Sequence, residues 1–320
     1  MVYLRVAGRA IVNVHSANAE GAVGNYMALS KMFIVRRSES GYEVSEEPVI
    51  SGNMLKHWHA VAMVEVLKSW NYDKLCENCK RHVMYRSTLN LDDEFQYIQR
   101  CAIEDVHGFL ATEKQIRRES LVKISFMIPV EDQRAEYSSI TFNRVVMDEK
   151  GSIPSREQAM MVMKREHASG IYGFLCSMDL GFAGISLSDP GKRLPPDEAG
   201  IRIKAAIAAL TNLLSGRFGA AQARSLPIMK VIELICIASR KPVPNAVHGF
   251  YKDYASETAR IIKSAIEQKL VDAGDVKIVV VGDGVADSFK ESGISYDVAG
   301  TAAEALSRVM EAVDNWLQLR

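Results

Sequence analysis

The chain has 320 residues, of which 48% are hydrophobic and 24% are charged. This is the composition of an ordinary globular protein with one large core or two smaller ones. Lysine plus arginine and aspartate plus glutamate both number 39, so the formal net charge is zero. The balance excludes a general electrostatic attraction to nucleic acid, and any site for a polyanion must therefore be a local basic patch.

The sequence also indicates a cellular location. Its N-terminal segment lacks the pattern of a signal peptide, and no apolar run approaches the ~20 residues that span a bilayer. Five cysteines in a chain of this length do not form the framework of a disulfide-rich domain. We therefore expect a cytoplasmic protein that does not associate with a membrane.

The N-terminal part of the chain predicts a strand, a loop, a hairpin and a helix. Residues 2–14 alternate β-branched and polar side chains, which favours a strand, and Gly8 is a candidate bulge. A polar loop follows. Residues 32–49 then read as a hairpin that leads into a helix over about 53–70.

The middle of the chain differs in composition and in hydrophobic pattern from the segments before it. Residues 71–115 are charged, carry little strand pattern and hold three of the cysteines, which predicts an inserted helical lobe. Residues 120–130 return to the sheet as a strand. Residues 131–165, with the turn signal "DEKGSIP", predict a long protruding hairpin.

The next elements define a fold class. A core strand over 167–187, a helix over 198–215 and a buried strand over 228–239 follow the hairpin. The order strand, helix, strand, strand, helix, strand is that of a ferredoxin-like α+β unit. Such a unit needs only ~80–100 residues, so much of the chain is elaboration around it.

The C-terminal part adds further elements to this unit. A helix over 252–272, a strand "VKIVVVG" and a helix over 301–318 are expected there. The "VVVGDG" sequence resembles the start of a nucleotide-binding turn, but no GxGxxG follows it. We therefore interpret this sequence as the end of a strand.

The segment "VISGNMLKHWHA" sets Ser-Gly-Asn before an apolar helix. Ser51 or Asn53 can cap that helix, and its free N–H groups attract anions. Lys56 and His57 in the first turns would add to a phosphate site. The alternative is an ordinary N-cap followed by surface residues.

Two loops contain polar and basic residues that form further candidate sites for phosphate or ribose. The first loop runs from a strand edge and offers amide groups and a cation to phosphate or ribose, at Asn13, His15, Asn18, Asn25 and Lys31. The second, Gly216 to Arg224, combines glycines with Arg217 and Arg224 but lacks the Walker A pattern. Both loops can also be explained by turn and helix-capping chemistry alone.

Three of the cysteines are candidate ligands of a metal ion. Cys76, Cys79 and His82 have C-x2-C-x2-H spacing, and Cys101 follows. Zinc prefers four such ligands. The alternative is free cysteines without a metal, and we expect no cofactor to be required.

An enzymatic interpretation depends on histidine. His15, His57 or His167 could act as the general base of an RNA-cleaving site beside a basic patch. The sequence pairs none of them with a second catalytic group, so no catalytic residue is assigned.

The order of these motifs resembles a known family. A "GNY…K" loop, a basic hairpin, "PVISGNMLKH", "CAIEDVHGFL", "RRESLVKISFMIPV" and "REHASGIYGF" follow one another as in the DevR-like backbone subunit of archaeal type I-A CRISPR Cascade-type complexes, of the RAMP superfamily. The similarity covers roughly residues 1–270. The resemblance implies an RRM-type core with finger and thumb insertions and a protein that binds CRISPR RNA without cutting it.

The resemblance divides the chain and assigns partners. Residues 1–70, 116–130 and 166–250 would form the core, 71–115 the helical lobe, 131–165 the thumb and 251–320 a C-terminal elaboration. The expected partners are guide RNA, target DNA in the assembled complex, other Cascade-type subunits and further copies of the chain, head to tail. The alternative function is a RAMP-type endoribonuclease that processes precursor RNA with a histidine base.

The resemblance also collects the candidate residues into one RNA-binding surface. The core strands "KISFMIPV" and "IELICIAS" lack the aromatic pair of a base-stacking RRM, so the RNA backbone should be the target. Arg144 is expected near the thumb tip. The expected RNA-binding residues are Asn13, His15, Asn18, Asn25, Lys31, Ser51, Gly52, Asn53, Lys56, His57, Arg144, His167, Arg217 and Arg224.

Overall fold

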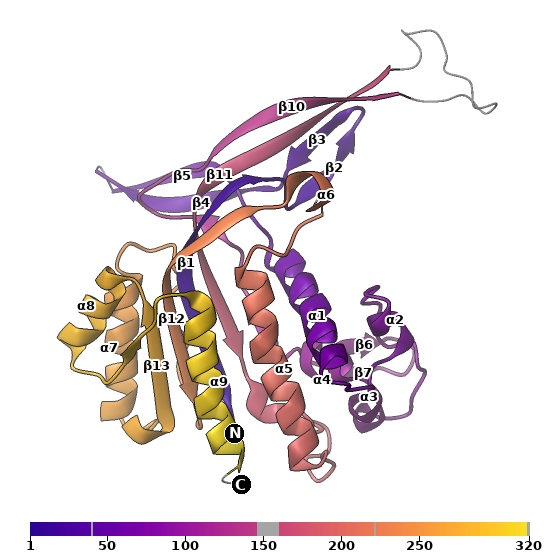
Figure 1. Ribbon diagram of the computed structural model, residues 1–320, viewed down its shortest axis with the longest axis vertical. Helices are drawn as coiled ribbons and strands as arrows, with labels where there is room; N and C mark the ends of the chain where they lie inside the picture. The colour runs from indigo at the N-terminus through magenta and orange to yellow at the C-terminus, as the bar shows by residue number, and fades with distance from the viewer. Residues whose placement is uncertain (40, 146–159, 221, 319–320) are drawn as a thin grey trace.

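A mixed α/β architecture surrounds one central sheet (Figure 1). The computed structural model describes residues 1–39, 41–145, 160–220 and 222–318. In the middle of the sheet, β1 (Tyr3–His15) lies between β11 (Met160–Met178) and β12 (Ile228–Ser239), and it is antiparallel to both. Most of β1 is buried, because apolar side chains on both of its faces meet helices.

The other elements are distributed along the chain as follows. The remaining strands are β2 (Ala19–Val23), β3 (Tyr26–Leu29), β4 (Lys31–Ser38), β5 (Gly41–Pro48), β6 (Phe109–Ala111), β7 (Ile116–Arg118), β8 (Val122–Ile124), β9 (Ile128–Pro129), β10 (Glu136–Val145), β13 (Val276–Val281) and β14 (Asp297–Val298). The α-helices are α1 (Gly52–Ser69), α2 (Glu77–Lys80), α3 (Glu94–Arg100), α4 (Ala102–His107), α5 (Pro196–Leu214), α6 (Gln222–Ser225), α7 (Tyr254–Glu267), α8 (Asp283–Ser292) and α9 (Ala302–Gln318).

The expected bulge in the first strand lies just after Gly8. The β1–β12 register shifts between Arg9 and Ala10. A Cβ atom added at Gly8 would lie 2.3 Å from the carbonyl oxygen of Glu233. Glycine is therefore needed here because the neighbouring backbone approaches closely.

The far edge of the core sheet is built from two short strands. Both β8 and β9 pair antiparallel with β11, so the strand expected over 120–130 is real but interrupted. At the interruption, His248 Nε2 lies 3.0 Å from Ser125 Oγ and 3.0 Å from the carbonyl oxygen of Phe126. The spatial order of the core strands is β12, β1, β11 and then β8 with β9.

Helices cover both faces of this sheet. On one face, α1 packs against α5 and α5 against α9, over a large apolar core shared with the strands. On the other face, α7 and α8 pack on β12 and β13 around a second apolar cluster. Figure 1 shows the two layers on opposite sides of the strands. No helix within the described ranges is long and apolar enough to cross a bilayer.

The loop expected after the first strand is a hairpin instead. β2 and β3 pair antiparallel across a turn in which Gly24 has φ +60°, and β3 runs parallel to β11 at Lys164 and Arg165. The prediction of a polar loop was wrong because the two short segments lack a clear alternation of apolar and polar residues. The Gly24-Asn25 pair, which is a hairpin-turn signal, was the available clue.

A two-stranded arm projects from the body of the protein. The arm consists of Glu136–Val145 of β10 and Met160–Ser169 of β11, paired antiparallel throughout. Figure 1 shows it extending away from the sheet. The "DEKGSIP" turn lies outside the described residues.

Several other boundaries differ from the expected ones. The core strand expected over 167–187 ends at Met178, and a 3-10 turn, Leu180–Phe182, follows. The helix expected over 252–272 is shorter, and helix α8 was not predicted at all. The hairpin over 32–49 and the helices α1, α5 and α9 occupy nearly the predicted residues.

The lobe, residues 71–115, is only partly helical. It contains α2, α3 and α4 joined by irregular chain, and it ends in the small β6–β7 hairpin. Buried ion pairs join this region to the core. Arg118 pairs with Glu94 at 2.6 Å and with Asp105 at 2.7 Å, and Asp105 pairs with Arg202 of α5 at 2.8 Å.

Candidate nucleic-acid interface

The N-terminal end of α1 is a capped helix mouth formed by residues 51–54. Ser51 has extended backbone angles, and its Oγ accepts a hydrogen bond from the amide of Met54 at 3.2 Å. The other N–H groups of the first turn give this end a partial positive charge. The cap that the Ser-Gly-Asn sequence predicts is present, and a helix end of this kind attracts anions.

Asn18 holds the cap in place. Its side-chain Nδ2 donates to Ser51 Oγ at 2.9 Å, and its Oδ1 accepts from the Ser51 amide at 2.9 Å. Both polar ends of the side chain are therefore engaged by the protein. The structure thus brings the segment after β1 and the helix mouth together, with Asn18 as a positioning residue.

Gly52 packs α1 onto the sheet. A Cβ atom at this position would lie 2.2 Å from the carbonyl oxygen of Ile124 and 3.0 Å from the backbone of Ser125. Only glycine permits this approach of the helix to β8. Gly52 is buried, whereas Asn53 beside it is exposed and Ser51 and Met54 are half-buried.

A cluster of basic groups lies one turn into α1. Burial lowers the pKa of Lys56, and the nearby Arg86 guanidinium lowers it further. Burial also lowers the pKa of the His57 side chain, with Arg86 and His82 adding to the effect. The Lys56 and Arg86 charges repel each other, and a bound anion would relieve the repulsion. The imidazole of His57 would contribute a hydrogen bond.

Arg86 is the functional candidate that sequence reasoning missed. It lies in the lobe, thirty residues beyond Lys56, and donates a hydrogen bond to the carbonyl oxygen of His107 at 2.8 Å. The irregular chain around it carries no periodic pattern from which its position could be inferred. The run of basic residues at 80–82 was the only local signal.

The glycine-bearing loop after α5 reaches the same region. The Ala220 amide donates to the carbonyl oxygen of Ala17 at 3.0 Å, and Gly219 with φ +106° lies against Ala17. Arg217 forms an ion pair with Glu65 of α1 at 3.0 Å. Arg224 is exposed on α6. The two predicted loops therefore meet beside the helix mouth.

Lys31 lies at the base of the arm with its charge already matched. Its Nζ is 3.3 Å from Glu166 Oε1 and 3.8 Å from the ring centre of Tyr137. Tyr26 also donates a hydrogen bond to Glu166. The carbonyl oxygen of Asn25 accepts from the Lys164 amide at 2.8 Å, which fixes the β2–β3 turn against the arm.

Two of the candidate histidines are buried. His15 is fully buried and its Nε2 lies 2.8 Å from the hydroxyl of Tyr172. His167 is only 6% exposed, and its ring centre is 6.3 Å from that of Phe142. Both sit at the junction of sheet and arm, and neither faces solvent as a general base for RNA cleavage would need to.

The two remaining candidates lie on strands. Asn13 is half-buried near the end of β1, opposite Ile228. Arg144 lies on β10 opposite Met161, far along the arm from its base, and its side chain lies outside the described residues.

The burial of His15 predicts an acid-sensitive contribution to stability. Burial, with the neighbouring His167, lowers the pKa of His15 to about 4, whereas the unfolded chain takes up this proton near 6.5. Acidification from pH 7.5 to 5 therefore favours unfolding by about 2 kcal/mol through this residue. Wild type should lose that much more than His15→Gln in urea titrations at the two pH values. Equal losses would contradict the assignment.

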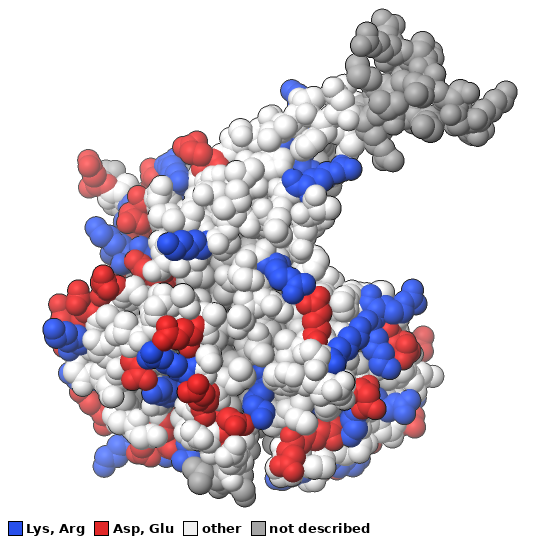
Figure 2. Space-filling model, in the orientation of Figure 1, with Lys and Arg blue, Asp and Glu red and all other residues white. Residues whose placement is uncertain are grey.

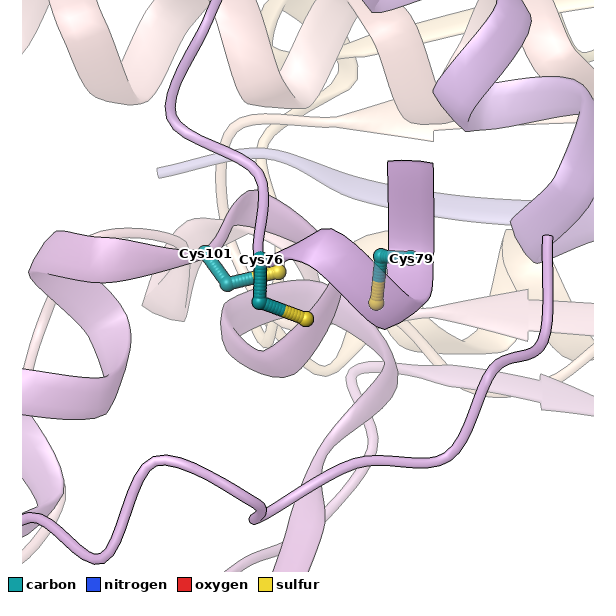
Figure 3. A group of neighbouring side chains, drawn as sticks. All are labelled: Cys76, Cys79 and Cys101. Atoms are coloured by element: carbon teal, nitrogen blue, oxygen red, sulfur yellow. The ribbon is translucent and has the colours of Figure 1, made fainter. Parts of the chain in front are cut away.

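The cysteines form a separate cluster within the lobe. The sulfur atoms of Cys76, Cys79 and Cys101 lie within 4.8 Å of one another (Figure 3). The imidazole of His82, the fourth expected member, lies outside this group.

The surface around the helix mouth is concave. Figure 2 shows a hollow flank between the projecting arm and the lobe, with basic and acidic side chains mixed on the lobe. The mouth of α1, the loop after α5 and the base of the arm are joined by the contacts above. An elongated anionic chain could lie along such a flank and meet several positive groups.

The fold of the chain has counterparts among solved structures. Two solved structures described as "CRISPR RNA-guided surveillance complex" and "CRISPR RNA-guided surveillance complex, pre-nicking" align with 97% of this chain and with 99% and 100% of theirs. Their TM-scores are 0.50 and 0.53, at 10% sequence identity. The likeness establishes a shared fold.

The sequence then gives the family. Residues 6–259 match the family described as "CRISPR-associated negative auto-regulator DevR/Csa2". The chain is 41% identical to "CRISPR-associated protein Cas7/Cst2/DevR" of Methanocaldococcus jannaschii over 82% of its length and 89% of that protein. A Thermoproteus tenax protein of the same description is 38% identical, with 83% of each chain covered. The chain belongs to the DevR/Csa2 family.

A third relative is more distant in sequence and carries a different description. The Saccharolobus solfataricus "CRISPR-associated aCascade subunit Cas7/Csa2 2" is 27% identical over 78% of this chain and 83% of that protein. The family resemblance inferred from the sequence is confirmed.

Proposed function

We propose that the protein is a non-catalytic backbone subunit that binds guide RNA in a Cascade-type surveillance complex. The observation that carries the proposal is that several groups able to bind phosphate come together at the N-terminal end of α1. There Ser51, positioned by Asn18, caps a helix beside Lys56 and Arg86. Family membership supports the same function.

The core fits a ferredoxin-like, RRM-type unit. Strands β1, β8, β11 and β12 follow the chain order of that unit, with α1 after the first and α5 before the last. Their spatial order, with β12 and β11 flanking β1 and β8 outside β11, is the order of the split βαβ motif. The lobe at 71–115 and the arm would then be its finger and thumb insertions.

Recognition is directed at the RNA backbone. A helix mouth and a small basic cluster bind phosphate and carry no information about base sequence. A subunit that repeats along variable guides needs this tolerance, since base pairing with target DNA supplies the specificity. The zero net charge suits copies that stack head to tail, because neighbouring copies do not repel strongly.

The test is a double substitution in the first turns of α1, next to the helix mouth. Lys56→Ala with His57→Ala should weaken binding to unrelated single-stranded RNAs by similar factors, because a phosphate contact is lost. The slope of log affinity against log salt should shrink by about 0.7 for each phosphate contact removed. Fluorescence anisotropy across a salt series measures both quantities.

The control keeps the number of substitutions and moves them away from the mouth. Lys263→Ala with Lys290→Ala removes two exposed lysines on α7 and α8 and should leave affinity nearly unchanged. Equal losses in both variants, or loss for one RNA sequence only, would contradict the proposed interface. Discrete cleavage of labelled repeat RNA in EDTA would instead support the endoribonuclease.

A further inference from the structure

The three thiols of the lobe come from two separate segments. Cys76 precedes α2 and Cys79 lies within it, while Cys101 precedes α4. All three are buried free cysteines, and Figure 3 shows their sulfur atoms turned toward a common space. Three thiolates around one zinc ion would lie about 3.8 Å apart, given Zn–S bonds of about 2.3 Å. The observed limit of 4.8 Å is close to that arrangement.

A buried carboxylate adjoins the cluster. Glu104 lies in the first turn of α4, the helix that Cys101 precedes as its N-cap residue. Glu104 is fully buried, and its Oε1 accepts from the Ser87 amide at 2.8 Å. Its Oε2 has no hydrogen-bond partner among the described residues. A buried carboxylate oxygen without a partner is costly, and a metal ion is one means of satisfying it.

We propose that Cys76, Cys79 and Cys101 bind one zinc ion as thiolates and that Glu104 is its fourth ligand. The pattern is C-x2-C on one segment and C-x2-E on the other. Glu104 lies outside the 4.8 Å sulfur group, so its carboxylate rotates toward the sulfurs when the ion binds. A closed set of four protein ligands is typical of a structural zinc site.

The lobe has the features of a region that a metal stabilises. Its separate apolar cluster has Tyr97, Phe109 and Ala111 as buried members, while the thiol-bearing segments pack on the main core. Four non-glycine residues with positive φ occur between these two segments, at His82, Met84, Ser87 and Asn90. A zinc ion would close this irregular loop and add binding energy to the contacts that the segments make with the core.

The experiment measures metal in the whole chain, independently of RNA binding. We expect wild-type protein purified under reducing conditions to carry one zinc per chain by inductively coupled plasma mass spectrometry. After removal of zinc with a chelator, added Co²⁺ should give a thiolate-to-cobalt charge-transfer band in the near ultraviolet. Zinc removal should also lower the melting temperature.

Variants locate the ligands. Cys76→Ser with Cys79→Ser should lose zinc, while Cys236→Ala, which removes a buried cysteine of β12, should retain it. Glu104→Gln should bind zinc at least about tenfold more weakly, and His82→Ala should bind it unchanged. Metal titration of the apo wild-type chain tests the site even where a variant fails to fold.

Three results would overturn the proposal. A wild-type chain without zinc, from cells grown with added zinc, that gives no cobalt charge-transfer band has no such site. Loss of two titratable thiols in the wild-type chain would show a disulfide instead. Unchanged zinc affinity in Glu104→Gln, or a loss in His82→Ala, would remove Glu104 as the fourth ligand.

Discussion

Arg118→Met should lower the free energy of unfolding by about 3–5 kcal/mol, because it leaves the buried Glu94 without its counter-charge and removes one of the two guanidinium partners of Asp105. The guanidinium is fully buried and bonds Glu94 at 2.6 Å and Asp105 at 2.7 Å. It also donates to the carbonyl oxygens of Phe182 and Ile185. Urea denaturation monitored by circular dichroism measures the loss.

Arg117 gives a control one residue away. It lies on the same strand but is exposed, so Arg117→Met should change stability by no more than about 0.5 kcal/mol. Equal effects of the two substitutions would mean that the buried ion pairs do not hold the lobe to the body.

Shortening the arm should abolish ordered assembly on RNA while leaving the monomer folded. Residues 142–163 can be replaced by Asn-Gly, because Thr141 and Lys164 are opposite each other in the antiparallel ladder. Val162, which the replacement removes, is 41% exposed, and Ile140 beside the shortened end is 46% exposed. An isolated ribbon that exposes such apolar groups suits contact with another protein copy.

The two properties of the shortened chain are measured separately. Mass photometry on RNAs of increasing length should show species that grow stepwise for wild type and only single subunits for the shortened chain. Thermal unfolding and binding to a short oligonucleotide should change little. Stepwise growth without the arm would exclude it from the contact, and loss of cooperative unfolding would make it part of the core.

Much of the fold could be predicted because strong periodic patterns coincide with long buried elements. In α5 the apolar residues recur at helix spacing and meet the core, and β12 is a nearly continuous apolar run whose second half is buried throughout. Short elements stabilised by tertiary contact could not be predicted. β9 has two residues, and α8 is a weakly apolar segment whose buried anchors are only Val285 and Phe289.

The candidate site also has parts that the local sequence predicts and parts that it does not. The cap at Ser51 could be inferred because capping depends on local sequence. The contacts of Asn18 and Arg86 depend on segments distant in the chain, and no local rule indicates them. The burial of His15 was also missed, since a polar residue at a strand end usually faces solvent.

The central position of β1 has a consequence for how the chain folds during synthesis. Leu4 of β1 pairs with Met178 and with Ala238, so β1 leaves the ribosome well before either of the two strands that it pairs with. At 5–20 residues per second it waits roughly 10–50 s for the later of them. Contacts so distant in sequence slow folding, and during this interval the apolar faces of β1 are exposed to chaperones and to other nascent chains.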